Sequence, residues 1–392
     1  MENYYLGNGR KWKYINETND KENTDNATDE LLKKLLYQRG LLTSEDIERF
    51  LKPSLNDLHD PFLLDGMNDA VDRIILAIQK KEKILIYGDY DADGVSATSI
   101  LIRYFRSLDL PVDYYIPDRV DEGYGISDFA VEFISSSYYD LVITVDCGIS
   151  ARSQVSEIVE KCEKRGRKID IIITDHHQCK EELIPDALAI INPHLPDSKY
   201  PYKDLCGTGI ALKLIHALGI RTGNARAFED YLDIAAIATI ADIVDLKGEN
   251  RIITKFGLEK IHNNPCIGIK ALLNAALLNK AQLDSYKVSF IIAPRINAAG
   301  RMGDAGIAVK LFATDDESEA NEYAFILNSS NTKRQEIQDK IFKEAVKIID
   351  DDSEYDNEKV IVVYHENWHH GVIGIVASKL VDRYNKPVFV FS

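Results

Sequence analysis

Short apolar runs alternate with amphipathic stretches through the middle of the chain. Five runs are continuous enough to be buried strands: Ile84–Tyr87, Val112–Ile116, Leu141–Val145, Ile169–Ile173 and Leu188–Ile191. Helical periodicity follows the first three runs, at residues 95–107, 128–135 and 152–165. Apolar strands separated by helices are typical of a parallel sheet that is covered on both faces. The pattern therefore predicts an α/β fold for this part of the chain.

The segments on either side of this region predict further parts. Residues 16–30 carry almost no apolar side chain and indicate a flexible surface loop, and two short helices are predicted after it. The stretch 318–350 contains neither Pro nor Gly and predicts one long spacer helix. A strand, a helix and a strand are then predicted at 360–363, 372–384 and 388–390. A unit of roughly 40 residues rarely holds its own core, so we expect the chain to be truncated inside a second α/β domain.

We therefore expect four parts. They are a helical leader at 1–75, the α/β domain at 76–250, a helical connector at 251–350 and a partial domain at 351–392.

Composition and charge narrow the class of protein. Hydrophobic residues make up 45% of the chain, and 47 Lys and Arg against 63 Asp and Glu give a formal charge of −16. This charge excludes a simple basic nucleic-acid coat protein but not a nucleic-acid enzyme. The five cysteines form no CxxC pair, and the apolar stretch 234–241 is far too short to cross a bilayer. The amino terminus lacks the apolar core of a secretory signal, so we expect a cytoplasmic protein without a membrane anchor.

Carboxylates and imidazoles stand directly after three of the predicted strands. They are Asp89, Asp91 and Asp93 after the first strand, Asp146 after the third, and Asp175, His176 and His177 after the fourth. Asp242 follows the apolar helix at 234–241. Because ligands bind at the carboxyl ends of the strands in open parallel sheets, we expect these groups to converge. Such a cluster needs a cation, and Asp with His but no Cys fits Mn²⁺ or Mg²⁺, with room for two ions.

Each of these residues also has a simpler interpretation. A single aspartate after a strand is most often a turn residue or a helix cap, and adjacent histidines often serve packing. The GDYDADG segment also suggests a calcium loop, but an EF-hand needs a glutamate where Ser99 and Ile100 stand. The metal interpretation rests on the joint placement at successive strand ends.

Four motifs in this order resemble the DHH phosphoesterase family: GDYDADG at 88–94, VDCG at 145–148, TDHH at 174–177 and ADIVDL at 241–246. Other stretches are similar to one branch of that family, the bacterial RecJ exonucleases. They are FLKPSLNDLHDPFLL at 50–64, PRINAAGRMG at 294–303, NTKRQ at 331–335 and WHHGVIGIVASKL at 368–380.

The resemblance implies a metal-dependent exonuclease that digests single-stranded DNA from its 5′ end. It would release 5′-mononucleotides in DNA repair and recombination. Metal ligation is then expected from Asp91, Asp93, Asp146, His176 and Asp242, with catalytic roles for His177, Asp93 and Asp89. Phosphate and DNA contacts are expected from Arg295, Asn297, Arg301, Arg334 and His369. The resemblance also suggests a monomer that works with a helicase and a single-strand-binding protein.

The arginine assignments agree with simple chemistry. Arg295 and Arg301 flank the small residues NAAG, which let a phosphate backbone approach closely, and a guanidinium group matches the geometry of phosphate. The alternative for these arginines is a solvated surface or pairing with a carboxylate, and for His369 it is packing at a domain interface. Because the chain is acidic, we expect any basic surface to be confined to a strip between the domains.

Three departures from the family pattern stand out. Tyr87 occupies a position that is His in many DHH proteins, and a phenol is a poor ligand, so we expect a weakly held second metal. Asp245 stands where several RecJ sequences have Pro, which predicts only a backbone difference. The chain also ends before the GSxRS-type motif that the resemblance predicts further on.

Two other functions remain open on the sequence alone. One is a phosphodiesterase of short oligonucleotides or cyclic dinucleotides, which a comparison of long strands with dinucleotides as substrates would distinguish. The other is a non-catalytic DNA-binding fragment, for which Asp93→Ala would change little.

Overall fold

The computed structural model describes residues 4–7, 10–13, 27–278, 283–352, 355 and 358–392. The chain divides into two compact units, residues 1–57 and 58–392. The first unit contains an antiparallel pair of strands, β1 (Tyr4–Gly7) and β2 (Arg10–Lys13), and the helices α1 (Ala27–Gln38) and α2 (Ser44–Leu51). The pattern predicted the two helices but not the strands. Of the loop predicted at 16–30, residues 16–26 lie outside the described residues, and α1 already begins at Ala27.

The start of α2 shows why the sequence signal was sufficient there. The Thr43 side chain accepts a hydrogen bond from the Asp46 backbone N–H at 3.0 Å, and the Asp46 carboxylate accepts one from the Thr43 N–H at 3.3 Å. This reciprocal pair satisfies two N–H groups that a helix leaves without partners at its amino end.

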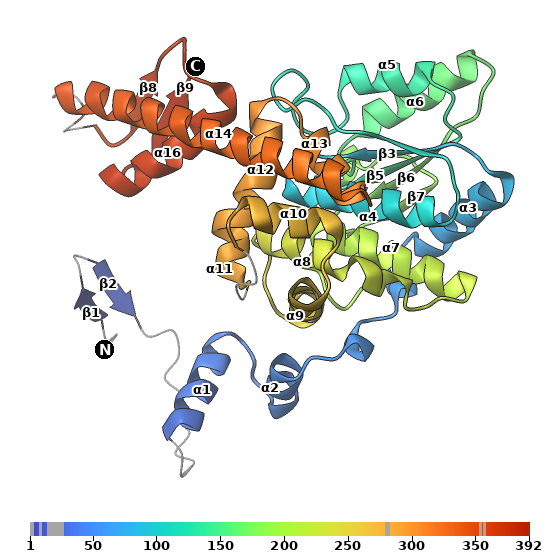
Figure 1. Cartoon of the computed structure of the whole chain (residues 1–392), viewed down its shortest axis with the longest axis horizontal. Helices are drawn as coiled ribbons and strands as arrows, with labels where there is room; N and C mark the ends of the chain where they lie inside the picture. The colour runs from blue at the N-terminus through green and yellow to red at the C-terminus, as the bar shows by residue number, and fades with distance from the viewer. Residues whose placement is uncertain (1–3, 8–9, 14–26, 279–282, 353–354, 356–357) are drawn as a thin grey trace. The chain divides into compact units, whose positions relative to one another are not determined.

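The second unit is built on a five-stranded parallel sheet in the order β4-β3-β5-β6-β7. The strands are β3 (Ile84–Gly88), β4 (Val112–Tyr115), β5 (Leu141–Val145), β6 (Asp170–Thr174) and β7 (Ala189–Ile191). The helices between and before them are α3 (Met67–Lys80), α4 (Ala92–Ser107), α5 (Asp128–Ser136) and α6 (Arg152–Lys164). Figure 1 shows α5 and α6 on one side of the sheet and α4 on the other. This arrangement confirms the predicted α/β fold.

The chain reverses its direction of travel across the sheet next to β3. It passes from β3 to β4 on one side and then returns to β5 on the other. Such a switch point leaves a crevice at the carboxyl ends of the two strands, because the helices that follow them cover opposite faces. The segments after β3 and β5 therefore border the natural ligand site of this sheet.

The rest of the second unit is mainly helical. It contains α7 (Gly207–Thr222), α8 (Leu232–Ala241), α9 (Gly248–Asn263), α10 (Ile267–Ala275), α11 (Ser285–Lys287), a π-helical turn at Val288–Ile292, α12 (Ala293–Met302), α13 (Gly306–Ala313) and α14 (Glu317–Asp351). The long helix predicted at 318–350 is confirmed as α14. Short 3-10 turns of this unit are found at Pro61–Leu63, Glu181–Leu183 and Ala227–Tyr231, and another lies at the end of the first unit, at Leu55–Asp57.

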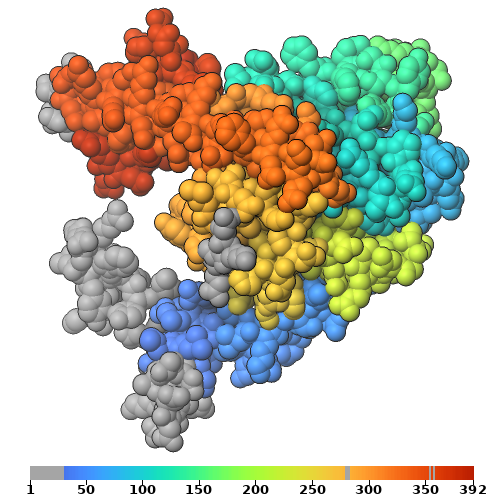
Figure 2. Space-filling view, viewed as in Figure 1, coloured from blue at the N-terminus to red at the C-terminus, as the bar shows by residue number. Residues whose placement is uncertain are grey.

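The C-terminal elements share a core with the long helix. Strands β8 (Ile361–Tyr364) and β9 (Val388–Phe391) pair in parallel, and α16 (His370–Tyr384) connects them. Their buried side chains pack with Ile341, Ala345 and Ile349 of α14. Figure 2 shows the orange surface of α14 running into the red surface of these elements. This small strand–helix–strand unit therefore relies on α14 to complete its core.

The boundary expected at residue 75 falls inside α3, within the second unit. Residues before α3 are already attached to the second unit. Lys213 of α7 and Glu249 of α9 form a buried ion pair there, with atoms 2.8 Å apart. Glu249 also accepts the His59 N–H at 3.0 Å, and Lys213 donates to the His59 carbonyl. These bonds fix residue 59 to the helices of the second unit. The finer division at residues 250 and 350 stays a prediction.

Among the described residues, no helix is long and apolar enough to span a membrane.

Candidate metal centre

The segment after β3 places two aspartates at the start of α4. Asp91 is the N-cap of α4, and one of its carboxylate oxygens accepts the N–H groups of Asp93 and Gly94 at 2.8 and 3.1 Å. Asp93 reaches the start of α7 instead, where its two oxygens accept the N–H groups of Gly207 and Thr208 at 2.6 and 2.8 Å. Both carboxylates are therefore fixed by helix amino ends, which favour negative charge.

Asp146, directly after β5, completes the wall of the crevice. Its backbone is left-handed with φ of 59°, a conformation that Asp adopts more readily than most residues. Gly207 allows this approach, because a Cβ there would stand 2.6 Å from the Asp146 Cβ. The start of α7 therefore packs directly between Asp93 and Asp146.

His176, after β6, joins the carboxylates from the separate segments. Its Nε2 atom lies 3.1 Å from Asp146 Oδ1, 3.8 Å from Asp93 Oδ2 and 3.7 Å from Asp242 Oδ2. Asp242 arrives from the carboxyl end of α8. Three overlapping groups have ligand atoms within 4.8 Å of one another: Asp93–His176–Asp242, Asp146–His176–His177 and Asp89–Asp91–Asp146. The structure thus brings all five expected ligands, with Asp89 and His177, to one place.

Four buried atoms of this cluster have no hydrogen-bond partner among the described residues: Asp89 Oδ1, Asp146 Oδ1, His176 Nε2 and Asp242 Oδ2. Leaving one such group unsatisfied costs roughly 1–3 kcal/mol, so four together indicate a missing partner. Oxygen and imidazole donors without sulfur fit a hard divalent cation such as Mn²⁺ or Mg²⁺. The residues present therefore fit the metal site that the motifs predicted.

The electrostatics of the cluster point in the same direction. Burial, and then the neighbouring carboxylates, raise the pKa of Asp146 well above its usual value. The same causes raise the pKa of Asp242 to about 8 and that of Asp89 to about 7. Burial lowers the pKa of His176, which favours the neutral imidazole that ligates metals. The cluster therefore carries a repulsion that bound cations would relieve.

His177 stands at the exposed edge of the cluster. Its Nδ1 atom lies 2.8 Å from Asp175 Oδ1, and this hydrogen bond is the main cause that raises the pKa of His177. Asp175 is fully buried and also accepts the N–H groups of His176, His177 and Ile149. The His177 side chain is 43% exposed, so it can meet a substrate from the solvent side.

The three arginines expected to contact DNA make hydrogen bonds only to neutral groups among the described residues. Arg295 donates to Asn328 and to the Ile291 carbonyl, Arg334 to Asn331 and Gln338, and Arg301 to the Gly371 carbonyl. Among the described residues none of the three forms an ion pair. Burial and the nearby cations Arg119 and Arg334 lower the pKa of Arg301 to about 10. A cluster of partly or fully buried guanidinium groups that form no ion pair among the described residues is suited to an anion such as phosphate.

Arg119 is a member of this cluster that sequence reasoning missed. It lies in the segment after β4, over the ring of Tyr90 at 4.7 Å from the centroid. Its charge acts on both Asp89 and Arg301, so it lies near both the acidic cluster and the arginines. The available signal was its place after a strand, at the same edge of the sheet as the aspartates.

Two other expected DNA contacts have structural bonds in this chain. Asn297 of α12 accepts the Ala92 N–H at 2.8 Å, which ties the connector to the start of α4. His369 caps α16 by accepting the Gly371 N–H at 3.1 Å. Their contacts with DNA stay predictions.

The Tyr87 side chain has a structural partner in the core. It is fully buried in the core between the sheet and α5 and α6, and its hydroxyl donates to the Gly125 carbonyl at 2.8 Å. This position therefore supports the loop before α5. Asp245 is exposed and pairs with Lys247 at 2.7 Å, while Asp242 keeps its place in the cluster.

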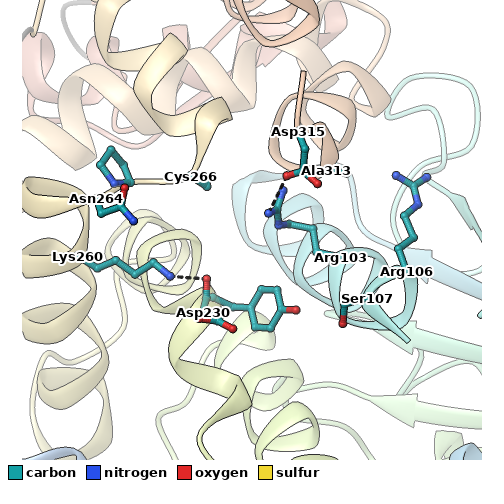
Figure 3. A pocket seen from close by; sticks show the side chains of 11 residues that line it. Arg103, Arg106, Ser107, Asp230, Lys260, Asn264, Cys266, Ala313 and Asp315 are labelled. Carbon is teal, nitrogen blue, oxygen red and sulfur yellow. Dashed lines mark hydrogen bonds and ion pairs between the residues drawn. The ribbon is translucent and has the colours of Figure 1, made fainter. Parts of the chain in front are cut away.

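A second pocket, of about 470 Å³, lies at the other end of α4 and contains several basic side chains (Figure 3). Arg103 is paired with Asp315 at 3.0 Å and donates to the Phe312 carbonyl. Lys260 donates to the carbonyls of Glu229 and Asp230. Arg103 and Lys260 therefore already compensate carbonyls and a carboxylate of the chain.

Comparisons with known proteins agree with this geometry. The family model described as "DHH family, N-terminal domain" matches residues 83–239. The "Single-stranded-DNA-specific exonuclease RecJ" of Bacillus subtilis is 41% identical over 360 residues, which are 92% of this chain and 44% of that protein. The chain thus spans less than half the length of that relative.

Solved structures give the same likeness. The structure described as "Crystal structure of exonuclease RecJ bound to manganese" has a TM-score of 0.76 at 34% identity, covering 86% of this chain and 82% of that one. RecJ of Thermus thermophilus in complex with Mn²⁺ has a TM-score of 0.75 at 32% identity, covering 91% of this chain and 49% of that one. A further structure of the Thermus protein holds Mg²⁺.

The fold and the acidic cluster define a DHH-type phosphoesterase domain, which the family model also matches. Within that class, the chain belongs to the RecJ exonuclease family.

Proposed function

We propose that this chain carries the catalytic centre of a metal-dependent exonuclease that hydrolyses single-stranded DNA from its 5′ end and releases 5′-mononucleotides. One observation carries the proposal: four buried ligand atoms without a hydrogen-bond partner among the described residues converge near a cluster of arginines that form no ion pair there. The first feature suits divalent cations, and the second suits the phosphates of a nucleic acid. The names of the relatives support the substrate and the use of Mn²⁺ or Mg²⁺.

The side chains have distinct roles in this proposal. Asp91, Asp93, Asp146, His176 and Asp242 would hold the cations, with Asp89 in support. When bound, such ions lower the pKa of the attacking water and neutralise charge on the phosphate. The hydrogen bond with Asp175 raises the pKa of His177 and favours its imidazolium form, in which both ring nitrogens carry a hydrogen. In that form His177 donates a hydrogen bond from Nε2 to a phosphate oxygen as negative charge develops there. Arg119, Arg301 and Arg334 hold the phosphates near the 5′ end in the correct register.

Cellular context belongs to the proposal as well. We propose a monomer that acts in the cytoplasm, in DNA repair and recombination, with a helicase and a single-strand-binding protein supplying its substrate. This part is supported by the family resemblance alone.

The direct test is digestion of a long single strand that carries a label at its 5′ end, in the presence of Mn²⁺. We expect early release of labelled mononucleotide by the wild type and none by Asp93→Ala. Release of label only from the 3′ end would contradict the proposed polarity. Cleavage of dinucleotides alone would favour the oligonucleotide phosphodiesterase, and failure on both substrates would favour a non-catalytic DNA-binding fragment.

Arg119→Gln tests the phosphate role of the arginine cluster. We expect KM for the long strand to rise roughly tenfold while kcat changes little, because one phosphate contact is lost outside the metal centre. The slope of log KM against log salt concentration should also fall by about one, because one phosphate contact is lost. Lys247→Gln is a matched control, since Lys247 already pairs with Asp245. An unchanged salt slope would contradict this role.

A further inference from the structure

The loop between β4 and α5 is held rigidly at its base. Glu122 accepts hydrogen bonds from the Tyr115 hydroxyl, the Asp118 N–H and the Ser127 hydroxyl. Tyr115 in turn stacks on Tyr87, with ring centroids 5.4 Å apart and an angle of 11° between the planes. These contacts anchor the first part of the loop to the core beside the sheet.

Tyr87 holds a second point of the same loop, at Gly125. The buried Tyr87 hydroxyl donates to the Gly125 carbonyl at 2.8 Å. Tyr124 stands between two glycines with left-handed backbones, Gly123 at φ of 78° and Gly125 at φ of 88°. This double turn, which other residues adopt only with strain, directs Tyr124 out of the loop. Tyr87 thus fixes the residue next to Tyr124.

The Tyr124 hydroxyl ends at His177. It lies 3.0 Å from His177 Nδ1 and 3.3 Å from the Asp146 carbonyl, and the two rings meet edge to face at 5.5 Å. His177 Nδ1 also faces the Asp175 carboxylate at 2.8 Å. A hydrogen on Nδ1 can be shared by both oxygens, while the hydroxyl hydrogen of Tyr124 goes to the Asp146 carbonyl. This arrangement leaves Nε2 as the ring nitrogen that faces outward.

The contact between Tyr124 and His177 matters because a cavity lies beside the two side chains. A hollow of about 270 Å³ borders Tyr124 and His177 and is also lined by Ser150, Gln154 and Gln178. An imidazole ring held on one side only has room to rotate into this hollow. Asp175 supplies one point of attachment, and the Tyr124 hydroxyl supplies the second.

We propose that Tyr124 is a positioning residue: its hydroxyl, held in place from the core by Tyr87, orients the His177 ring toward the substrate phosphate. This inference rests on the proposed function of His177. It also explains the residue at position 87, where a tyrosine supports the loop that aligns a catalytic side chain.

Kinetics of single and double variants test the proposal. We expect Tyr124→Phe to lower kcat roughly tenfold and to change KM less than twofold, because the lost hydrogen bond aligns His177 without binding DNA. Tyr87→Phe should lower kcat as well, and it should add little when Tyr124→Phe is already present, since it acts through Tyr124. Tyr138→Phe, at a 79% exposed tyrosine, is the matched control and should leave kcat unchanged. Independent, additive effects of the two substitutions would overturn the proposal.

A second readout does not depend on DNA cleavage. The ring nitrogen resonances of His177 can be followed in metal-free protein labelled with ¹⁵N-histidine and assigned by their loss in His177→Gln. We expect them to move in Tyr124→Phe and in Tyr87→Phe, and to stay in place in Tyr138→Phe. Unmoved His177 resonances in the first two variants would overturn the positioning role. If the wild type fails to degrade DNA while these resonances move as expected, the proposed function fails and the positioning of His177 stands.

Discussion

Asp146→Asn should abolish the proposed exonuclease activity, lowering kcat by at least roughly a thousandfold, which corresponds to about 4 kcal/mol of transition-state stabilisation. Asp146 takes part in two of the three groups that could hold a metal, so its charge is shared by the whole centre. Asn tolerates a left-handed backbone as well as Asp does, and the φ of 59° therefore poses no obstacle to folding. The loss should thus come from the chemistry of the site.

The same substitution should have the opposite effect on stability. Without metal, replacing the fully buried Asp146 carboxylate by an amide removes repulsion with Asp93, Asp91 and Asp89. We expect the melting temperature of metal-free Asp146→Asn to equal or exceed that of the wild type, while its increase on adding Mn²⁺ is largely lost. Asp245→Asn, at an exposed carboxylate outside the cluster, is the matched control. A variant that is less stable without metal and still responds to Mn²⁺ would contradict the assignment.

The fold was predictable wherever burial was strong. Strands such as Leu141–Val145 are continuous apolar runs, because helices cover both faces of the sheet, and their bounds follow the pattern closely. The strands Tyr4–Gly7 and Arg10–Lys13 were missed, since short strands of mixed polarity give no clear period. The π-helical turn at Val288–Ile292 was also missed, because it leaves no separate periodic signal.

Some residues of the candidate site were predictable from the sequence, and others were not. Asp91, Asp146 and His176 follow strands, so topology alone brings them to one edge. Arg119 and Tyr124 lie in the loop after β4, where the only available signal was the place of Arg119 shortly after a strand. Their importance depends on contacts with residues that are distant in sequence, and only the folded chain shows those contacts. The contact of Tyr87 was not predictable for the same reason, since its partner Gly125 is 38 residues away.

The metal-free protein should become more stable as the pH falls from about 8 to about 6.5. The pKa of Asp242 is raised to about 8 and that of Asp89 to about 7, while the unfolded chain has the ordinary value of 3.8. In this range the folded protein therefore binds protons that the unfolded chain does not, so the free energy of unfolding rises as the pH falls. Below 6.5 the lowered pKa of His176 acts in the opposite direction, because the unfolded chain then binds the extra proton.

Mn²⁺ should remove this dependence. Metal binding requires the ionised carboxylates, so protons and cations compete for the same oxygens, and the stabilisation by Mn²⁺ should shrink as the pH falls through the same range. Chemical denaturation at pH 8 and pH 6.5, with EDTA or with excess Mn²⁺, measures the four free energies of unfolding. In the EDTA series each group contributes at most about 1.4 kcal/mol per pH unit. If the free energy of unfolding depends on pH in the same way in both series, these carboxylates do not hold the metal. If they do hold it, Asp146→Asn should make the pH dependence of the metal-free protein shallower.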